Sequence, residues 1–172
     1  DVVRGTFVDH NPTPWKWGYP RAMKRFHWLV AFSIGCGTDP VDAEGTYQVN
    51  VTNRDDGCNL AWTVNESTSG IPVIVTQNGE AAIADVQGGG GFALDVFLGV
   101  STFSGTVDGN ELDLAAQGTR ARTTGNCTYT YNGQILATLT GDTLNGRINY
   151  RSAHNNNTDC AAITCLSYQD LN

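Results

Sequence analysis

Lysine is scarce in this chain of 172 residues. The only two lysines are Lys16 and Lys24, so the sequence from residue 36 onward contains five arginines and no lysine. That same part carries fifteen Asp and Glu residues against the five arginines, which gives it a formal charge of −10. Binding to nucleic acid and adhesion to anionic lipid both depend on clustered basic side chains. The composition therefore argues against both of these functions.

Histidine and the common catalytic motifs are also scarce. Only His154 follows residue 36, and it lies in an Asn-rich stretch that is typical of a solvated loop. No Gly-x-Ser-x-Gly segment is present to supply an exposed nucleophile, and a single histidine leaves too few ligands for zinc. Asn53, Asp55 and Asp56 crowd one turn and could bind calcium, although turn formation is the simpler role. We expect no triad enzyme, no metal site and no cofactor.

Long hydrophobic runs are missing, because the longest one, residues 26–35, has ten residues and a membrane-spanning helix needs roughly 20. This run follows the only methionine, Met23, and two cations, as in the n-region and h-region of a secretory signal. It ends in Ser33-Ile34-Gly35-Cys36, which resembles the bacterial lipobox. In that motif a small residue precedes a cysteine that is lipidated and becomes the new N-terminus. Ser33 stands where the lipobox usually has Leu or another aliphatic residue.

The lipobox resemblance implies a lipoprotein of four segments. Residues 1–22 would lie upstream of the native start, residues 23–35 would be the signal peptide, and the turn-rich residues 36–44 would be a flexible tether. Residues 45–172 would form a single exported domain, held to the outer membrane by lipid on Cys36. In the alternative interpretation the apolar run packs on the domain, and Cys36 is a fifth structural cysteine.

The other four cysteines predict two disulfides, because an even number in an exported domain is typical of a disulfide framework. They are Cys58, Cys127, Cys160 and Cys165. Three pairings are possible. Because Cys160 and Cys165 enclose only four residues, a local bridge between them is favoured, which leaves Cys58 to pair with Cys127.

The fold class predicted from residue 45 onward is all-β. Short runs of β-branched and aromatic residues recur between turn dipeptides: Asn78-Gly79, Asp108-Gly109, Asn132-Gly133 and Gly141-Asp142. Nothing is predicted to be helical, and short connections favour sequential antiparallel pairing. Closing the sheet would remove its edges, so we expect an up-and-down β-barrel of 8–10 strands, with a two-sheet β-sandwich as the alternative. The predicted strands are residues 46–52, 59–64, 71–77, 80–87, 92–98, 101–107, 111–116, 120–131, 134–140 and 147–151.

The strand number and turn rhythm resemble those of lipocalins and other calycins. This resemblance implies a barrel that is either filled with side chains or hollow enough for one small apolar ligand. The large aromatic residues are candidates for the barrel core or for the lining of a cavity, and core packing is a sufficient role for most of them. The cavity candidates are Trp62, Phe92, Phe103, Tyr129 and Tyr131, with Phe97 as a further large side chain.

Two carboxylates form the main candidate for catalysis. If residues 89–91 make a three-residue hairpin loop, Asp85 and Asp95 face each other across the strands, as glycoside hydrolysis would require of its paired carboxylates. Arg120 and Arg122 share a strand face and could clamp an anion, although pairing with the acidic surface is simpler. We expect an exported lipoprotein that binds a small apolar or amphipathic ligand without catalysis. The alternatives are a structural or protein-interaction lipoprotein with a filled barrel, and a small carbohydrate-active hydrolase.

Overall fold

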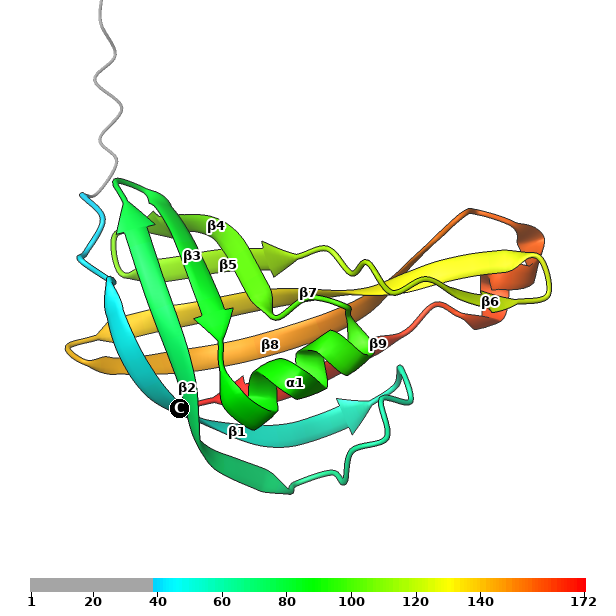
Figure 1. Ribbon diagram of the computed structural model, residues 1–172, viewed down its shortest axis with the longest axis horizontal. Helices are drawn as coiled ribbons and strands as arrows, with labels where there is room; N and C mark the ends of the chain where they lie inside the picture. The colour runs from blue at the N-terminus through cyan, green and yellow to red at the C-terminus, as the bar shows by residue number, and fades with distance from the viewer. Residues whose placement is uncertain (1–38) are drawn as a thin grey trace, which may run out of the picture. The chain divides into compact units, whose positions relative to one another are not determined.

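Strands with alternating side chains make up most of residues 39–172, the part of the chain that the computed structural model describes (Figure 1). In β1, for example, Val49 and Val51 are buried while Gln48 and Thr52 are more exposed. Cys36 and the expected signal peptide lie outside the described residues. The elements in chain order are β1 Gly45–Asp56, β2 Ser67–Asn78, β3 Ala81–Val86, α1 Gly88–Phe97, β4 Thr102–Asp108, β5 Glu111–Ala116, β6 Arg122–Thr124, β7 Cys127–Thr140, β8 Thr143–His154, the 3₁₀ helix η1 Thr158–Ala162, and β9 Leu166–Leu171.

The nine strands form one antiparallel sheet with the order β5-β4-β3-β2-β1-β9-β8-β7-β6. An additional pairing of β5 with β7 closes eight of these strands into a barrel, and β6 pairs only with β7. Each barrel strand lies beside its neighbour in the chain, and β9 returns to pair with β1. The predicted up-and-down barrel is therefore confirmed, and the two-sheet sandwich is wrong.

A ribbon extends beyond the barrel at one side (Figure 1). It consists of β6, the first part of β7 and the last part of β8, joined by pairs such as Arg122 with Tyr129 and Tyr129 with His154. The disulfide Cys127–Cys160 ties β7 to η1. The barrel core, by contrast, is built from the inward faces of the eight closed strands, with Phe103 and Val107 completely buried.

The segment expected to be a tether partly packs on the barrel. Ala43 is buried, and its N–H donates to Oε1 of Gln77 at 2.7 Å. The Gln77 amide in turn donates to the carbonyl of Val41 at 2.9 Å. Residues 41–43 are thus bonded to β2, and they lie at the start of the barrel wall.

The strand predicted at residues 92–98 is wrong, because α1 occupies this place. Gly88 has a φ of +62°, a left-handed conformation that turns the chain out of β3. A Cβ at Gly90 would lie only 2.6 Å from Cγ2 of Ile71, and one at Gly91 would overlap the Val86 carbonyl. The glycine run therefore brings a helix close against β2 and β3 instead of making a hairpin loop, so Asp95 does not face Asp85 across two strands.

The predicted turn at Asn132-Gly133 is also wrong, because both residues lie in the middle of β7. Glycine is needed here for space: a Cβ at Gly133 would lie 2.8 Å from the ring of Phe103. The Asn132 side chain accepts a hydrogen bond from the N–H of Gly118 at 3.0 Å. The hairpins predicted at residues 78–79, 108–109 and 141–142 are confirmed.

The predicted disulfide pairing is wrong as well. The structure joins Cys58 to Cys165 and Cys127 to Cys160, with Cα–Cα distances of 4.9 and 5.0 Å. The reason is the strand β9, which the sequence pattern does not predict. Its pairing with β1 sets Asp56 opposite Ser167 and so brings Cys58 beside Cys165.

The predicted strand at residues 59–64 is a loop instead, in which Asn59 and Ala61 have positive φ values of 55° and 65°.

The two disulfides should differ in their contribution to stability. Cys58–Cys165 closes 107 residues and Cys127–Cys160 closes 33. Loop-closure entropy then predicts losses of about 4.8 and about 3.7 kcal/mol in the free energy of unfolding when each pair is replaced by alanine. Urea unfolding of the two double variants measures the difference. A larger loss for the Cys127/Cys160 variant would contradict this entropic explanation.

Candidate ligand cavity in the barrel

The barrel is not completely filled, because a cavity of about 200 Å³ lies inside it. Its walls are the inward-facing residues of the barrel strands, residues of the loop that follows β1, and one face of α1. Within the described residues, none of the side chains that line it is charged. The apolar wall is typified by Val75, Leu112, Leu114, Ile135 and Leu144, and the polar side chains are Asn53, Thr68, Tyr150 and Gln169.

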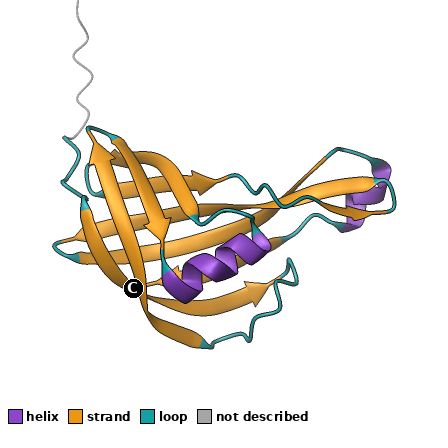
Figure 2. Ribbon diagram, viewed as in Figure 1, coloured by secondary structure: helices purple, strands orange, loops and turns teal. Residues whose placement is uncertain are grey.

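The helix α1 lies against the strands of the barrel (Figure 2). Five of its residues contribute to the lining of this cavity. Gly89, Gly90, Ala93, Leu94 and Phe97 all contribute to the lining, a spacing that places them along one helix face. The first turn of α1 comes close to β2 and β3 because its residues are glycines, which have no side chains. The helix therefore acts as one wall of the cavity.

The aromatic residues that the sequence suggests for a cavity lie in different parts of the structure. Trp62 lines the cavity, and so does Phe97. Phe92, on the outer face of α1, is 71% exposed, and Phe103 is completely buried in the core beneath Gly133.

Tyr129 and Tyr131 lie together in the ribbon, with their ring centroids 5.6 Å apart. The hydroxyl of Tyr131 donates to the carbonyl of Cys58 at 3.0 Å, and the guanidinium of Arg122 stacks on its ring at 4.9 Å. These two tyrosines therefore brace the ribbon and do not line the cavity. Arg120 and Arg122 form no anion clamp with each other, since Arg122 is stacked on Tyr131.

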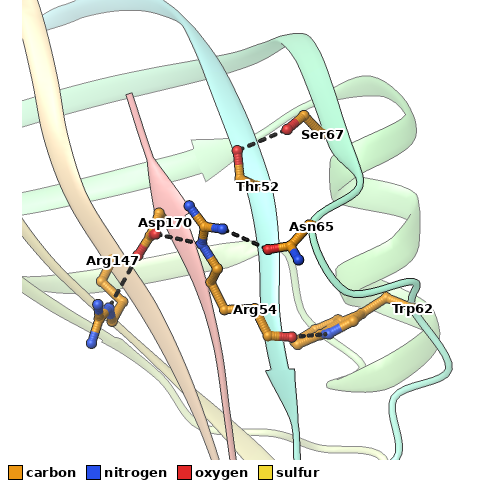
Figure 3. A network of polar contacts seen from close by, with 7 residues as sticks. All are labelled: Thr52, Arg54, Trp62, Asn65, Ser67, Arg147 and Asp170. Carbon is orange, nitrogen blue, oxygen red and sulfur yellow. Dashed lines mark hydrogen bonds and ion pairs between the residues drawn. The ribbon is translucent and has the colours of Figure 1, made fainter.

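Trp62 is held in the cavity wall by contacts with β1 and β8. Its indole N–H donates to the carbonyl of Arg54 at 3.0 Å (Figure 3), and its ring meets that of Tyr150 edge-on at 5.5 Å. On the outer face, the Arg54 guanidinium donates to Asn65 at 2.7 Å and pairs with Asp170 at 2.7 Å. Asn65, in the same loop as Trp62, is thus tied to β1 and, through Arg54, to β9.

Asp170 joins three strands of the barrel on this outer face. It pairs with Arg54 of β1 and, at 3.3 Å, with Arg147 of β8 (Figure 3). The hydrogen bond from Arg54, with a smaller contribution from Arg147, lowers the pKa of the Asp170 carboxyl below its ordinary value. The network keeps these charges outside the barrel and away from the cavity.

A chain of hydrogen bonds crosses the polar side of the cavity, and the sequence patterns do not indicate it. Tyr150 donates its hydroxyl to Oε1 of Gln169 at 2.7 Å, and Nε2 of Gln169 donates to Oδ1 of Asn53 at 2.6 Å. The amide of Asn53 then donates to the carbonyl of Thr63 at 3.2 Å. Asn53 and Gln169 face each other directly in the β1–β9 ladder. The alternation of β1, in which Val49, Val51 and Asn53 point inward, is the only sequence signal for this arrangement.

Burial strongly raises the pKa of the Tyr150 phenol above its ordinary value. The residue is only 3% exposed, and its ionised form would lie in a wall that offers no positive charge. The phenol therefore remains a neutral donor at physiological pH.

The other candidate residues have local structural roles. Both carboxylate oxygens of Asp56 accept backbone N–H groups, from Leu60 at 2.6 Å and Ala61 at 2.9 Å, which explains the acidic turn without calcium. Asp85 accepts from Gln87 at 2.6 Å, and His154 accepts the N–H of Asn156 at 3.1 Å. In the described part of the chain, no three His, Cys, Asp or Glu side chains are grouped closely enough to hold a metal ion.

A second hollow of about 370 Å³ lies beside the first part of β1 and the β7–β8 turn. Its lining is largely polar and includes Glu44 and Asp142. Although it is larger, it offers little apolar surface from which a ligand could displace water. The cavity inside the barrel is therefore the better candidate for a binding site.

Comparisons of the chain with protein-family models, curated proteins and solved structures found no match. Among the described residues, no helix has the length and apolar character needed to cross a membrane.

The buried phenol predicts a loss of stability in alkali. An unfolded tyrosine ionises near pH 10, whereas Tyr150 keeps its proton to higher pH in the folded protein, so unfolding releases a proton above pH 10. The free energy of unfolding should fall with a slope of up to about 1.4 kcal/mol per pH unit from this residue, and Tyr150→Phe should remove that part of the slope. Urea unfolding between pH 9 and pH 11.5 measures it.

Tyr168→Phe is the matched control, because the Tyr168 ring carries a stacked Arg147 guanidinium at 4.1 Å and its hydroxyl forms no hydrogen bond. This variant should retain the alkaline slope of the unaltered protein. An equal slope in the Tyr150→Phe variant would show that the buried phenol does not cause it.

Proposed function

We propose that this protein is an exported, lipid-anchored binding protein whose barrel takes up one small, largely apolar ligand without catalysis. The observation that carries the proposal is the apolar cavity of about 200 Å³ with a few polar groups on one wall. Ligand sites are commonly concave and apolar, with a small number of polar groups that fix orientation. An engineered protein cavity of about 150 Å³ holds benzene, so the volume here suits a ligand of one substituted ring or a short chain.

The expected affinity is modest. A ring that loses about 150–250 Å² of apolar surface to the cavity gains roughly 4–6 kcal/mol. Lost translational and rotational freedom offsets part of that gain. We therefore expect dissociation constants of about 0.1 mM or weaker, mostly in the millimolar range, for ligands of this size.

The alternatives have less support. A purely structural barrel would be expected to fill its interior, and here an apolar space remains. A carboxylate hydrolase would need two acidic groups at one cleft. No carboxylate of the described residues lines the cavity inside the barrel, whereas Glu44 and Asp142 line the separate polar hollow.

Export and lipid anchoring are supported by observations other than the cavity. The disulfides Cys58–Cys165 and Cys127–Cys160 are typical of proteins in oxidising compartments outside the cytoplasm. The lipobox-like sequence that ends at Cys36 supports lipidation there, and several acyl chains on one cysteine would hold the protein at the membrane. On this proposal the outer membrane anchors the barrel, and lipid makes the membrane contact in place of basic side chains.

Filling the cavity should abolish binding. Ala84 is 2% exposed and lines the cavity, so Ala84→Leu adds three carbon atoms to a space with little room. We expect its dissociation constant for ethylbenzene, measured by NMR titration, to rise at least tenfold. Ala81→Leu is the control, because Ala81 lies on the same strand but is exposed on the opposite face. Unchanged ethylbenzene binding in the Ala84→Leu variant would contradict the proposed site.

The lipid anchor has its own test. Bacterial cells that express the reading frame from Met23 should yield, in the membrane fraction, a chain that begins at Cys36 and carries a diacylglyceryl group. Intact-mass analysis detects this modification directly, and Cys36→Ala should remove both the added mass and the membrane association. An unmodified Cys36 in the unaltered protein would reject the anchor and leave the ligand cavity untouched.

A further inference from the structure

We propose that the cavity selects an uncharged ligand with one oxygen acceptor, which the side-chain amides of Gln169 and Asn53 bind through their N–H groups. This inference rests on the proposed ligand-binding function and narrows it to a chemical class: neutral molecules, of about the size of a substituted benzene ring, that carry a carbonyl, ether or hydroxyl oxygen. The charge of the lining, the direction of its hydrogen bonds and the position of the two amides each favour this class of ligand.

Charge is the first criterion, because the cavity offers no partner to an ion. None of its described lining residues is charged. Arg54 and Asp170, which follow Asn53 and Gln169 in the sequence, are paired with each other at 2.7 Å on the outer face of the barrel. A carboxylate or ammonium group inside would lose its water without gaining a counter-ion, which is strongly unfavourable. Charged ligands of the same shape are therefore excluded.

The direction of the hydrogen-bond chain is the second criterion, and the backbone fixes it. The carbonyl of Thr63 can only accept, so Asn53 must turn its NH₂ group toward that carbonyl. Its oxygen then faces Gln169, which must present its own NH₂ group to Asn53. The Gln169 oxygen is left to accept from the hydroxyl of Tyr150. Reversing any one amide would set two acceptors against each other.

This direction decides what remains for a ligand. The phenol proton is used within the chain, and each amide oxygen already accepts one hydrogen bond. Each of the two amide nitrogens, Nε2 of Gln169 and Nδ2 of Asn53, donates one hydrogen within the chain and has a second hydrogen left. Because both side chains line the cavity, these remaining N–H groups are the donors that the wall offers to a ligand. An oxygen acceptor on the ligand would satisfy them.

The position of the amides is the third criterion. Asn53 and Gln169 are directly opposed in the β1–β9 ladder, so their side chains are close together on one wall. The rest of the lining, as at Val75, Leu114 and Ile135, is apolar. A ligand would therefore place its ring among the apolar residues and its oxygen against the β1–β9 wall.

Three probes of matched shape test this selectivity on the full chain: ethylbenzene, acetophenone and benzoate. We expect acetophenone to bind about fivefold more tightly than ethylbenzene, the effect of one neutral hydrogen bond, and benzoate to bind at least a hundredfold more weakly than acetophenone. Calorimetry and NMR titration measure the affinities. The side-chain NH₂ resonances of Gln169 and Asn53 should shift downfield with acetophenone and not with ethylbenzene.

Gln169→Met should remove the preference for acetophenone, so that acetophenone and ethylbenzene bind this variant with about equal affinity. Gln134→Met is the matched control, because the Gln134 amide donates to Asp113 at 2.8 Å on the exposed side of the barrel. This control should keep the fivefold preference. If Gln169→Met does not fold, the comparison of probes on the unaltered protein still decides the matter.

The outcomes separate the two proposals. Equal binding of ethylbenzene and acetophenone, or tight binding of benzoate, would overturn the selectivity and leave the binding function in place. A fivefold preference that persists in a folded Gln169→Met variant would overturn the role of the amide. If no probe binds to the unaltered protein, the binding function fails and the selectivity fails with it.

Discussion

The pairing of β9 with β1 is the constraint on which the rest of the structure depends. It joins the last strand to the first and, together with the β5–β7 pairing, closes the barrel. The same ladder opposes Asn53 to Gln169 inside and supports the Arg54–Asp170 ion pair outside. Its far end brings Cys58 within bonding distance of Cys165. This one ladder, whose register shifts once between Asn53 and Asp56, therefore sets the closure, the polar wall of the cavity and a covalent link between distant parts of the chain.

Local patterns in the sequence predict those features that depend on neighbouring residues. Period-two alternation identifies most of the strands before β9, and glycine turns identify the hairpins at residues 78–79, 108–109 and 141–142. Because short connections force consecutive strands to pair, the all-β antiparallel barrel follows from these signals. The four cysteines after residue 36 likewise predict two disulfides, and these four cysteines do form two disulfides in the structure.

Features that depend on distant residues could not be predicted. Asn132-Gly133 reads as a turn, but its glycine makes room for the Phe103 ring from another strand. The glycine run before Phe92 reads as a hairpin loop, but it allows a helix to pack closely on the barrel. For the cavity, Trp62 is evident as a large aromatic residue, whereas the amide pair needs the register of β9. Tertiary packing determines the structure in each of these cases, and local sequence patterns carry no information about contacts between distant residues.

The four glycines at the start of α1 have a consequence for exchange between cavity and solvent. Glycine disfavours a helix by about 1 kcal/mol per residue relative to alanine, so this ten-residue helix depends on its packing against Ile71 and Val86. The surrounding strands are held by continuous ladders and by the disulfide at Cys58. The wall formed by α1 should thus fray before any strand separates. A guest molecule's residence time would then be limited by how often this first turn unwinds.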